Sequence, residues 1–280
     1  MSIEPGVLYV VATPIGNLAD FSERAREVLA GVDVIACEDT RHTGRLLSHF
    51  RIRVRTLSLH EHNERQRIDE IIALLREGRS VALVSDAGTP LISDPGFPLL
   101  RAVAEAGLRA SPVPGPSALV AALSVSGLPT DRFAFEGFLP AREAGRAKRL
   151  RAVAGEPRTL VFYESTHRLG ASLRAMADAL GATRAACVCR ELTKVHEQIR
   201  NGSLERLAKW AENDPDATRG EAVIVVAGAP ELDADAAEAE RILRLLLAEV
   251  GVRQAASLAA AITGRPRNAL YRQALDLKTS

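Results

Sequence analysis

The apolar run Val81–Val84 constrains the fold of this chain more than any other stretch. It breaks directly into Ser85-Asp86-Ala87-Gly88-Thr89-Pro90, and Asp94-Pro95-Gly96 follows a few residues later. An apolar run that ends in such breakers predicts a buried strand whose carboxyl end opens into a rigid loop. In open α/β sheets, ligands bind beyond the carboxyl ends of the strands. Gly88 would let a ligand approach the backbone, and Asp86 offers an acceptor to a hydroxyl or amine group. A strand followed by a simple tight turn is the alternative for this segment alone.

The first part of the chain repeats this arrangement of strand, loop and helix. Ser22 is placed to cap a helix whose apolar stripe is Ala25, Val28 and Leu29, and Gly31 is placed to end it. The alternation of strands and helices predicts a parallel sheet with helices on its faces. The expected strands are Val7–Val11, Val32–Cys37, Val54–Leu59, Val81–Val84 and Leu108–Val113.

Pro114-Gly115-Pro116 fits neither a helix nor an inner strand, so we expect a domain boundary there. Ser117 is placed to cap the helix Ala118–Ser126. Strands expected at Arg132–Phe138, Thr159–Tyr163, Ala185–Cys189 and Ala222–Ala227 indicate a second α/β domain. The fold class is therefore α/β, with two αβα domains, a cleft between them and a small C-terminal helical appendage. The expected domains are residues 1–115, 116–230 and 231–280.

The last fifty residues are alanine-rich and helical in pattern. The helix pair around Gly264 has the spacing of a helix-turn-helix. We favour instead a packing appendage with a basic outer face.

Composition excludes several classes of protein. The 36 basic and 35 acidic residues give a net charge of +1, so charge alone does not indicate a nucleic-acid binder. The three cysteines lie in apolar runs and are expected to be buried free thiols in a reducing compartment. His60-Glu61-His62 lacks the helical spacing of a zinc site, so we expect no metal. The chain shows neither a signal peptide nor a membrane span, which predicts a cytoplasmic protein without membrane contact.

Common nucleotide and hydrolase motifs are missing. No Gly-x-Gly-x-x-Gly follows the first strand and no Gly-x-x-x-x-Gly-Lys occurs, which disfavours a Rossmann site and a P-loop. No Gly-x-Ser-x-Gly elbow is present either. What remains is a ligand held mostly by backbone groups and small residues.

Eight motifs stand in order along the chain: Thr13-Pro14-Ile15-Gly16-Asn17-Leu18, Glu38-Asp39-Thr40-Arg41, Ser85-Asp86-Ala87-Gly88-Thr89-Pro90, Asp94-Pro95-Gly96, Pro114-Gly115-Pro116-Ser117-Ala118, Gly137-Phe138-Leu139-Pro140, Tyr163-Glu164-Ser165-Thr166-His167-Arg168 and Arg190-Glu191-Leu192-Thr193-Lys194. Together they resemble the ribosomal RNA small subunit methyltransferase I family, the 16S rRNA (cytidine-2′-O)-methyltransferases. That family is a branch of the tetrapyrrole methylase-like (class III) S-adenosylmethionine enzymes. One departure from the family pattern is Arg219, before Gly220-Glu221, where lysine is more usual.

The resemblance implies S-adenosylmethionine as cofactor, bound in the cleft, and a homodimer. It implies methylation of a cytidine 2′-hydroxyl in the small ribosomal subunit. The cofactor-binding residues carried over by motif are Pro14, Asp86, Ala87, Gly88, Thr89, Ser117, Ala118, Phe162, Tyr163, Leu192, Gly220, Glu221 and Ala222.

For catalysis we rank Glu38, Asp39 and Arg41 first, because their loop follows the strand beside the cofactor loop. A carboxylate there would accept the hydroxyl proton while Arg41 holds a phosphate. His42, Glu164 and His167 are further candidates, and a structural ion pair or helix cap is the alternative for each. The candidate RNA-binding residues are Arg142, Arg146, Lys148, Arg149, Arg151, Arg168 and Lys194, although a basic run is more often a solvated face.

Two other functions stay open from the sequence. One is a class III methylase acting on a tetrapyrrole or corrin precursor. The other is a non-catalytic nucleic-acid-binding protein that uses the terminal helix pair.

Overall fold

The structure is a computed structural model that describes residues 3–60, 63–230 and 234–279. Its contacts divide the chain into two compact units, residues 1–227 and residues 228–280. The first unit contains two five-stranded sheets. The domain boundaries expected at 115/116 and 230/231 remain a prediction. Glu61 and His62, part of the segment considered above for zinc, lie outside the described residues.

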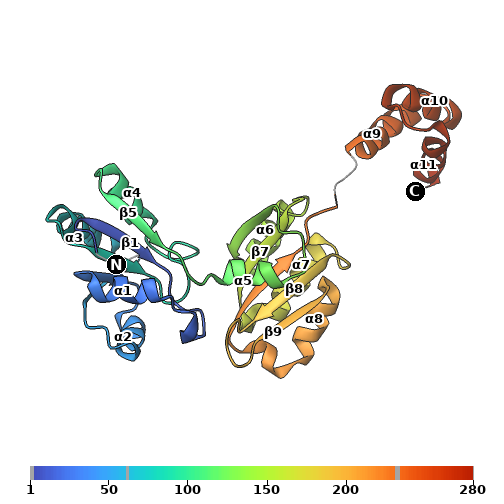
Figure 1. Cartoon of the computed structure of the whole chain (residues 1–280). Coiled ribbons are helices and arrows are strands. Elements are labelled where there is room, and N and C mark those ends of the chain that lie inside the picture. The colour runs from blue at the N-terminus through green and yellow to red at the C-terminus, as the bar shows by residue number, and fades with distance from the viewer. Residues whose placement is uncertain (1–2, 61–62, 231–233, 280) are drawn as a thin grey trace. The chain divides into compact units, whose positions relative to one another are not determined.

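The first sheet belongs to the blue-to-green part of the chain in Figure 1, where β1 and β5 are labelled. It is parallel and has the strand order β3-β2-β4-β1-β5. The segment Val81–Val84 forms the central strand, because its side chains are buried on both faces. All carboxyl ends of a parallel sheet lie at one edge, so the loops after β1, β2, β4 and β5 gather there. The strands are β1 Val7–Val11, β2 Val34–Cys37, β3 Arg55–Ser58, β4 Val81–Val84 and β5 Arg109–Val113.

Helices cover both faces of this sheet. Residues of α1 (Glu23–Gly31) and α2 (Thr40–His49) pack in one core cluster, and those of α3 (Glu64–Arg76) and α4 (Phe97–Glu105) pack in another. The predicted cap of α1 is confirmed, since Ser22 Oγ accepts the Ala25 backbone N–H at 3.1 Å. The helix ends at Gly31, as expected. A short 3₁₀ helix at Leu18–Asp20 precedes α1.

The second sheet is mixed and has the order β6-β7-β10-β8-β9. β6 and β7 are parallel, and the other neighbours are antiparallel. The edge strand β9 was not expected from the sequence, because Gln198-Ile199-Arg200-Asn201-Gly202-Ser203 is mostly polar; its residues are exposed or half-buried. The strands are β6 Phe133–Phe138, β7 Thr159–Ser165, β8 Ala185–Arg190, β9 Gln198–Ser203 and β10 Glu221–Val226.

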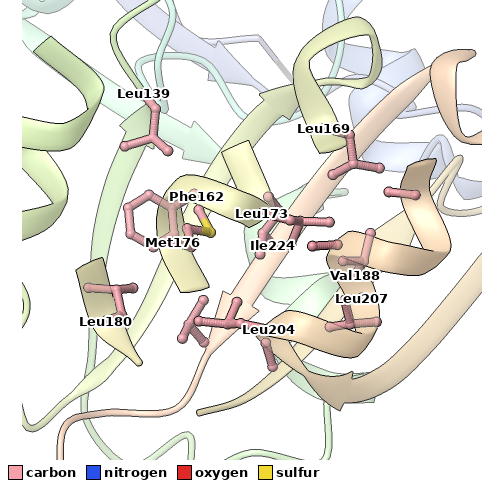
Figure 2. Packing of buried hydrophobic residues seen from close by; sticks show 14 of the residues in the cluster. Leu139, Phe162, Leu169, Leu173, Met176, Leu180, Val188, Leu204, Leu207 and Ile224 are labelled. Atoms are coloured by element: carbon pink, nitrogen blue, oxygen red, sulfur yellow. The ribbon is translucent and has the colours of Figure 1, made fainter. Parts of the chain in front are cut away.

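One face of the second sheet carries a large hydrophobic core. Figure 2 shows Phe162 and Ile224 from the sheet packed with Leu173 and Met176 of a covering helix. The helices that contribute to this core are α6 Glu143–Ala152, α7 Leu169–Leu180 and α8 Leu204–Asn213. Short 3₁₀ helices occur at Thr166–Arg168 and Pro215–Thr218.

The other face of the second sheet packs against α5 (Ala118–Val125) and against loops of the first sheet. Leu119 and Leu123 of α5 join Val161 and Val223 of the sheet in one cluster. Ile15, from the loop after β1, belongs to the same cluster. This face therefore meets the carboxyl edge of the first sheet within the same compact unit.

The second unit is a three-helix assembly with its own small core. Its helices are α9 Ala234–Glu249, α10 Val252–Thr263 and α11 Arg267–Thr279. Gly264 ends α10 in the left-handed conformation, with φ +73°, where glycine carries no Cβ penalty.

The cysteines are buried free thiols, as the sequence predicted. Among the described residues no helix is both long enough and apolar enough to cross a membrane.

Candidate functional site

The loop after β4 is tied to the loop after β1 by backbone hydrogen bonds. The Thr13 N–H donates to Gly88 O at 2.9 Å, and the Gly88 N–H donates to Thr13 O at 3.1 Å. Gly88 has φ +82°, and a Cβ there would lie 3.2 Å from Ile15 Cγ2. Both the backbone conformation and the close contact therefore favour glycine. Thr89 Oγ1 donates to Pro116 O at 3.0 Å and fixes the loop to the segment that leads to the second sheet.

The same loop continues through a strained turn. Leu91 and Ser93 have φ values of +77° and +71°, which are unusual for residues with a Cβ. The turn brings Asp94 beside Asp86. Burial raises the pKa of Asp94, a hydrogen bond with Ser85 opposes this shift, and the nearby Asp86 adds to it. Backbone strain of this kind clusters at ligand sites.

A cavity of about 390 Å³ lies between this loop and the second sheet. Its volume is in the range of small-molecule sites. Most of the cofactor residues predicted from the motifs line it, namely Asp86, Ala87, Gly88, Ala118, Tyr163, Leu192, Gly220, Glu221 and Ala222.

The remaining predicted cofactor residues lie elsewhere. Pro14 lines a neighbouring cavity, and Thr89 bonds to the inter-sheet segment. Phe162 is completely buried in the core on the other face of β7, so only its backbone is available to a ligand in the cavity. Successive residues of a strand face opposite sides, which explains why Tyr163 lines the cavity and Phe162 does not.

Ser117 occupies the N-cap position of α5, but its hydroxyl makes no capping bond, contrary to the sequence-based prediction. Tyr163 takes over part of this role. Its Oη accepts the Leu119 N–H at 3.2 Å, and its ring makes edge contacts with Phe135 and Phe138 at centroid distances of 4.9 and 5.6 Å. Burial raises the pKa of Tyr163, so the phenol is neutral and holds α5 beside the cavity.

Eight lining residues were not predicted as site residues: Ile15, Ile92, Ser93, Asp94, Phe138, Ser165, Cys189 and Val223. Asp94 and Phe138 belong to motifs recognised in the sequence, so the signal was available, although nothing local indicated that their side chains face a ligand.

The segment after β8 closes one side of the cavity. Glu191 and Thr193 have positive φ values of +48° and +66°. Glu191 Oε1 accepts from Lys194 Nζ at 2.8 Å and from the Glu221 N–H at 3.0 Å, and Lys194 Nζ also donates to Glu221 Oε2 at 3.0 Å. Burial works to raise the pKa of Glu191, but the hydrogen bonds from Lys194 and Glu221 outweigh it and lower the pKa.

A second cavity, of about 470 Å³, adjoins the first. Ile15, Asp86, Ala87 and Glu221 line both. The second cavity is also lined by side chains of α2 and by Lys194. Two adjoining cavities could hold two ligands that react with each other.

The catalytic candidates Glu38, Asp39 and Arg41 lie at the start of α2 and line neither cavity. Asp39 caps the helix, with Oδ1 accepting the Arg41 N–H at 2.8 Å, and Arg41 Nη2 donates to Asp39 Oδ2 at 2.9 Å. These hydrogen bonds lower the pKa of Asp39 to about 2. The loop does reach the site, because the Asp39 N–H donates to Asp86 Oδ1 at 3.2 Å.

The other base candidates occupy different environments. Glu164 lines the first cavity, but its side chain is buried: it forms an ion pair with Arg168 Nη2 and accepts a hydrogen bond from Ser172 Oγ, each at 2.5 Å. His167 is exposed, and His42 lines the second cavity.

The RNA-binding candidates divide into two groups. Arg142, Lys148 and Arg151 of the α6 region are exposed, whereas Arg146 is buried. The other candidates form ion pairs within the chain: Arg149 with Glu136, Arg168 with Glu164, and Lys194 with Glu191 and Glu221. No group of three or more potential metal ligands occurs among residues 3–60, 63–230 and 234–279.

The comparisons with known proteins agree with this geometry. Residues 7–208 match the family described as Tetrapyrrole (Corrin/Porphyrin) Methylases. Uroporphyrin-III-C-methyltransferase from Thermus thermophilus has the same fold, with a TM-score of 0.55 and 24% identity over 80% of this chain and 95% of that one. A cobalt precorrin-4 methyltransferase aligns with a TM-score of 0.59 and 16% identity over 79% and 95%. A Thermus thermophilus uroporphyrin-III C-methyltransferase solved with S-adenosylhomocysteine aligns with a TM-score of 0.54 and 20% identity, over 79% of this chain and 96% of that one.

The two-sheet fold and its adjoining cavities thus define a methylase of the tetrapyrrole methylase class. Relatives that match this chain over nearly its whole length identify the particular family within this class. "Ribosomal RNA small subunit methyltransferase I" of Escherichia coli O157:H7 is 53% identical over 97% of this chain and 95% of its own length. The Pseudomonas aeruginosa protein of that name is 55% identical over 97% of both chains. The chain therefore belongs to the ribosomal RNA small subunit methyltransferase I family.

The second unit has a family match of its own. Residues 233–278 match the RsmI C-terminal HTH domain. This corrects the interpretation that we favoured from the sequence, a packing appendage, and supports the helix-turn-helix alternative around Gly264. The periodic pattern alone could not distinguish the two, since both need the same apolar stripe.

Proposed function

We propose that the protein transfers a methyl group from S-adenosylmethionine to the ribose 2′-hydroxyl of a cytidine in the 16S rRNA of the small ribosomal subunit. The observation that carries the proposal is the cavity of about 390 Å³ where the motif residues of both sheets meet, directly beside a second cavity. The relatives named ribosomal RNA small subunit methyltransferase I support the rRNA substrate. A ribosomal substrate is consistent with a cytoplasmic location.

The residues of the first cavity fit S-adenosylmethionine. Asp86 and Asp94 supply carboxylates, which favour a ligand that carries a positive charge. Ile92, Leu192 and Tyr163 supply apolar and aromatic surface suited to a nucleoside. Gly88 exposes backbone at the cavity wall. When bound, S-adenosylmethionine supplies an electrophilic methyl group on a positively charged sulfur.

The residues of the chain have to orient and deprotonate a weak nucleophile. Orientation of reacting groups contributes about 7–11 kcal/mol in favourable systems, and a positioned base contributes about 10²–10⁴-fold. Asp39 is a poor base, because its pKa is about 2. We therefore propose that Glu38 accepts the 2′-hydroxyl proton and that the Asp39–Arg41 pair positions the loop against Asp86.

We propose that the exposed cations of the α6 region bind the RNA backbone. Arg142, Lys148 and Arg151 are exposed, and none is paired with another described residue. The paired residues Arg149, Arg168 and Lys194, and the buried Arg146, would contribute through local structure. We also propose a homodimer, which light scattering of the purified protein tests.

The direct test is methyl transfer from labelled S-adenosylmethionine to purified small subunits, followed by mapping of the modified nucleotide. We expect one 2′-O-methylcytidine in 16S rRNA. Label on a precorrin and none on subunits would instead support the corrin methylase. Absence of S-adenosylhomocysteine binding would support the non-catalytic alternative.

The base assignment has its own test. Glu38→Gln should lower the single-turnover rate by about 10²-fold or more. Asp39→Asn should have a smaller effect. If both variants react at the wild-type rate, this loop contains no general base.

A further inference from the structure

One face of α2 forms a wall of the second cavity. His42, Arg45 and His49 all line this cavity. Their spacing of three and then four residues places them on one face of the helix. They are potential cations at successive turns, and Lys194 lines the same cavity from the second sheet.

Arg45 is the unpaired cation of this wall. Its side chain is exposed, and no other described residue makes a hydrogen bond or an ion pair with its guanidinium. Lys194, in contrast, is bonded to Glu191 and Glu221. Burial works to lower the pKa of Lys194, but these carboxylates outweigh it and raise the pKa. A free guanidinium at the wall of a cavity is suited to a phosphate or carboxylate group.

The second cavity shares lining residues with the first cavity. Asp86 and Ala87 line both cavities and lie after the central strand. A ligand with an anionic group on the α2 face would therefore place its remaining atoms against the residues that also line the first cavity. The volume of about 470 Å³ is sufficient for a small-molecule-sized group such as a nucleotide.

We propose that the second cavity receives the target nucleotide, extruded from the RNA, and that Arg45, with His42 and His49, binds the phosphodiester on the 3′ side of its ribose. This inference rests on the proposed function and specifies its substrate subsite. Enzymes that modify a base take its nucleotide out of the stack into a pocket, and the proposal extends this arrangement to a nucleotide whose ribose reacts. The 2′-hydroxyl and the 3′-phosphodiester are on adjacent ribose carbons, so holding the phosphate fixes the hydroxyl beside the first cavity.

The α2 face therefore has a role different from that of the exposed cations near α6. Contacts with phosphates distant from the reacting ribose contribute affinity, whereas a contact with the adjacent phosphate also contributes orientation. Removal of the Arg45 side chain should lower the rate at which bound small subunits are methylated. Removal of the Lys148 or Arg151 side chain should chiefly weaken the binding of the subunits.

The experiment compares Arg45→Ala and Arg45→Glu with Arg76→Ala, using the full-length protein. Arg76 is an exposed arginine on α3, which packs on the opposite face of the first sheet, and is the matched control. Three quantities are measured: the single-turnover rate on saturating small subunits, the salt dependence of subunit binding, and S-adenosylhomocysteine affinity by calorimetry.

We expect Arg45→Ala to lower the single-turnover rate about tenfold or more. The slope of log K against log salt should fall by about 0.7–0.9, the contribution of one phosphate contact. Arg45→Glu should be slower still, and Arg76→Ala should match the wild type. S-adenosylhomocysteine affinity should stay within about twofold of wild type in all variants, since Arg45 lies outside the first cavity.

Two results would overturn the proposal. Wild-type rates and salt slopes in both Arg45 variants would show that the α2 face does not bind the reacting nucleotide. Loss of S-adenosylhomocysteine binding in Arg45→Ala would assign Arg45 to the cofactor site or to the fold. Failure of the wild type to methylate subunits refutes the proposed function instead, and the salt slopes then still decide whether Arg45 binds phosphate.

Discussion

Gly220 offers the sharpest test of how the first cavity, the proposed cofactor site, is built. It has φ +84°, and a Cβ at this position would lie 2.1 Å from Glu191 Oε1. Glu191 cannot stay in place beside an alanine, because real contacts of this kind are never so short. Gly220→Ala would therefore displace the carboxylate that accepts from Lys194 and from the Glu221 N–H.

The expected loss in the free energy of unfolding of Gly220→Ala has two parts. Placing a residue with a Cβ in the left-handed region costs about 1–2 kcal/mol. Losing the two hydrogen bonds of a partly buried carboxylate costs about 1–2 kcal/mol more, at the low end for charged groups because solvent reaches them. We therefore expect Gly220→Ala to lower the free energy of unfolding by about 2–4 kcal/mol.

Gly127→Ala is the matched control. Gly127 has φ +68°, and its nearest neighbour is Asn201 Nδ2 at 3.9 Å from an added Cβ, an ordinary contact. It should cost only the backbone part, about 1–2 kcal/mol. In a Glu191→Ala background Gly220→Ala should also cost only that part, because the clash is gone.

Urea unfolding followed by fluorescence measures these differences. Trp210 is the only tryptophan in the sequence, and it packs against the core of the second sheet, so it reports on the part of the chain that contains Gly220. S-adenosylhomocysteine affinity should fall roughly tenfold in Gly220→Ala, which corresponds to about 1.4 kcal/mol. Equal costs for Gly220→Ala and Gly127→Ala, together with no coupling to Glu191→Ala, would refute the reasoning.

Three further predictions concern the carboxylates. Asp94→Asn, assayed at pH 8, should weaken S-adenosylmethionine more than S-adenosylhomocysteine in calorimetry, because only the former carries the sulfonium charge; equal losses would contradict this role. Glu164→Gln should lower the free energy of unfolding by about 3–5 kcal/mol in urea, since it leaves the part-buried Arg168 without its partner. The pKa of Asp39 lies below its usual value of 3.8, at about 2, so its stabilising effect is present above pH 4 and is lost as the pH falls towards 2. Asp39→Asn should therefore lower the free energy of unfolding above about pH 4, with the difference from wild type shrinking as the pH falls towards 2, and should leave the pH–rate profile between about pH 5 and 8 unchanged in shape.

The first sheet was predictable because its signals are local. β-branched runs, the Ser22 cap and the Gly31 stop each act within a few residues, and the observed elements agree with them. The gathering of the motif loops was also predictable, since parallel strands place all their carboxyl ends at one edge. Sequence-based prediction failed where a hydrogen-bond partner is distant in the sequence. Nothing near Ser117 indicates that Tyr163 Oη would bond the start of α5 in place of the serine hydroxyl.

Helical periodicity could have divided the basic run near α6 into buried and exposed residues from the sequence alone. Arg146 and Leu150 are four residues apart and both are buried, so the run has an inner and an outer face. Counting every cation of the run as RNA-binding ignored this division. Its members that are both exposed and unpaired with other described residues, Arg142, Lys148 and Arg151, are the ones that we propose to contact phosphates.

The α2 helix combines a residue pattern that the sequence shows with a position that only the fold provides. Its sequence contains His42, Arg45 and His49 at helical spacing, but an isolated helix gives no reason to prefer this face to any other. The bond from the Asp39 N–H to Asp86 Oδ1 attaches the start of α2 to the loop after the central strand. That attachment brings the face of α2 with His42, Arg45 and His49 to the second cavity, which adjoins the first. The hydrogen bond between Asp39 and Asp86 thereby fixes this face of α2 relative to the first cavity, and this relation exists only in the folded chain.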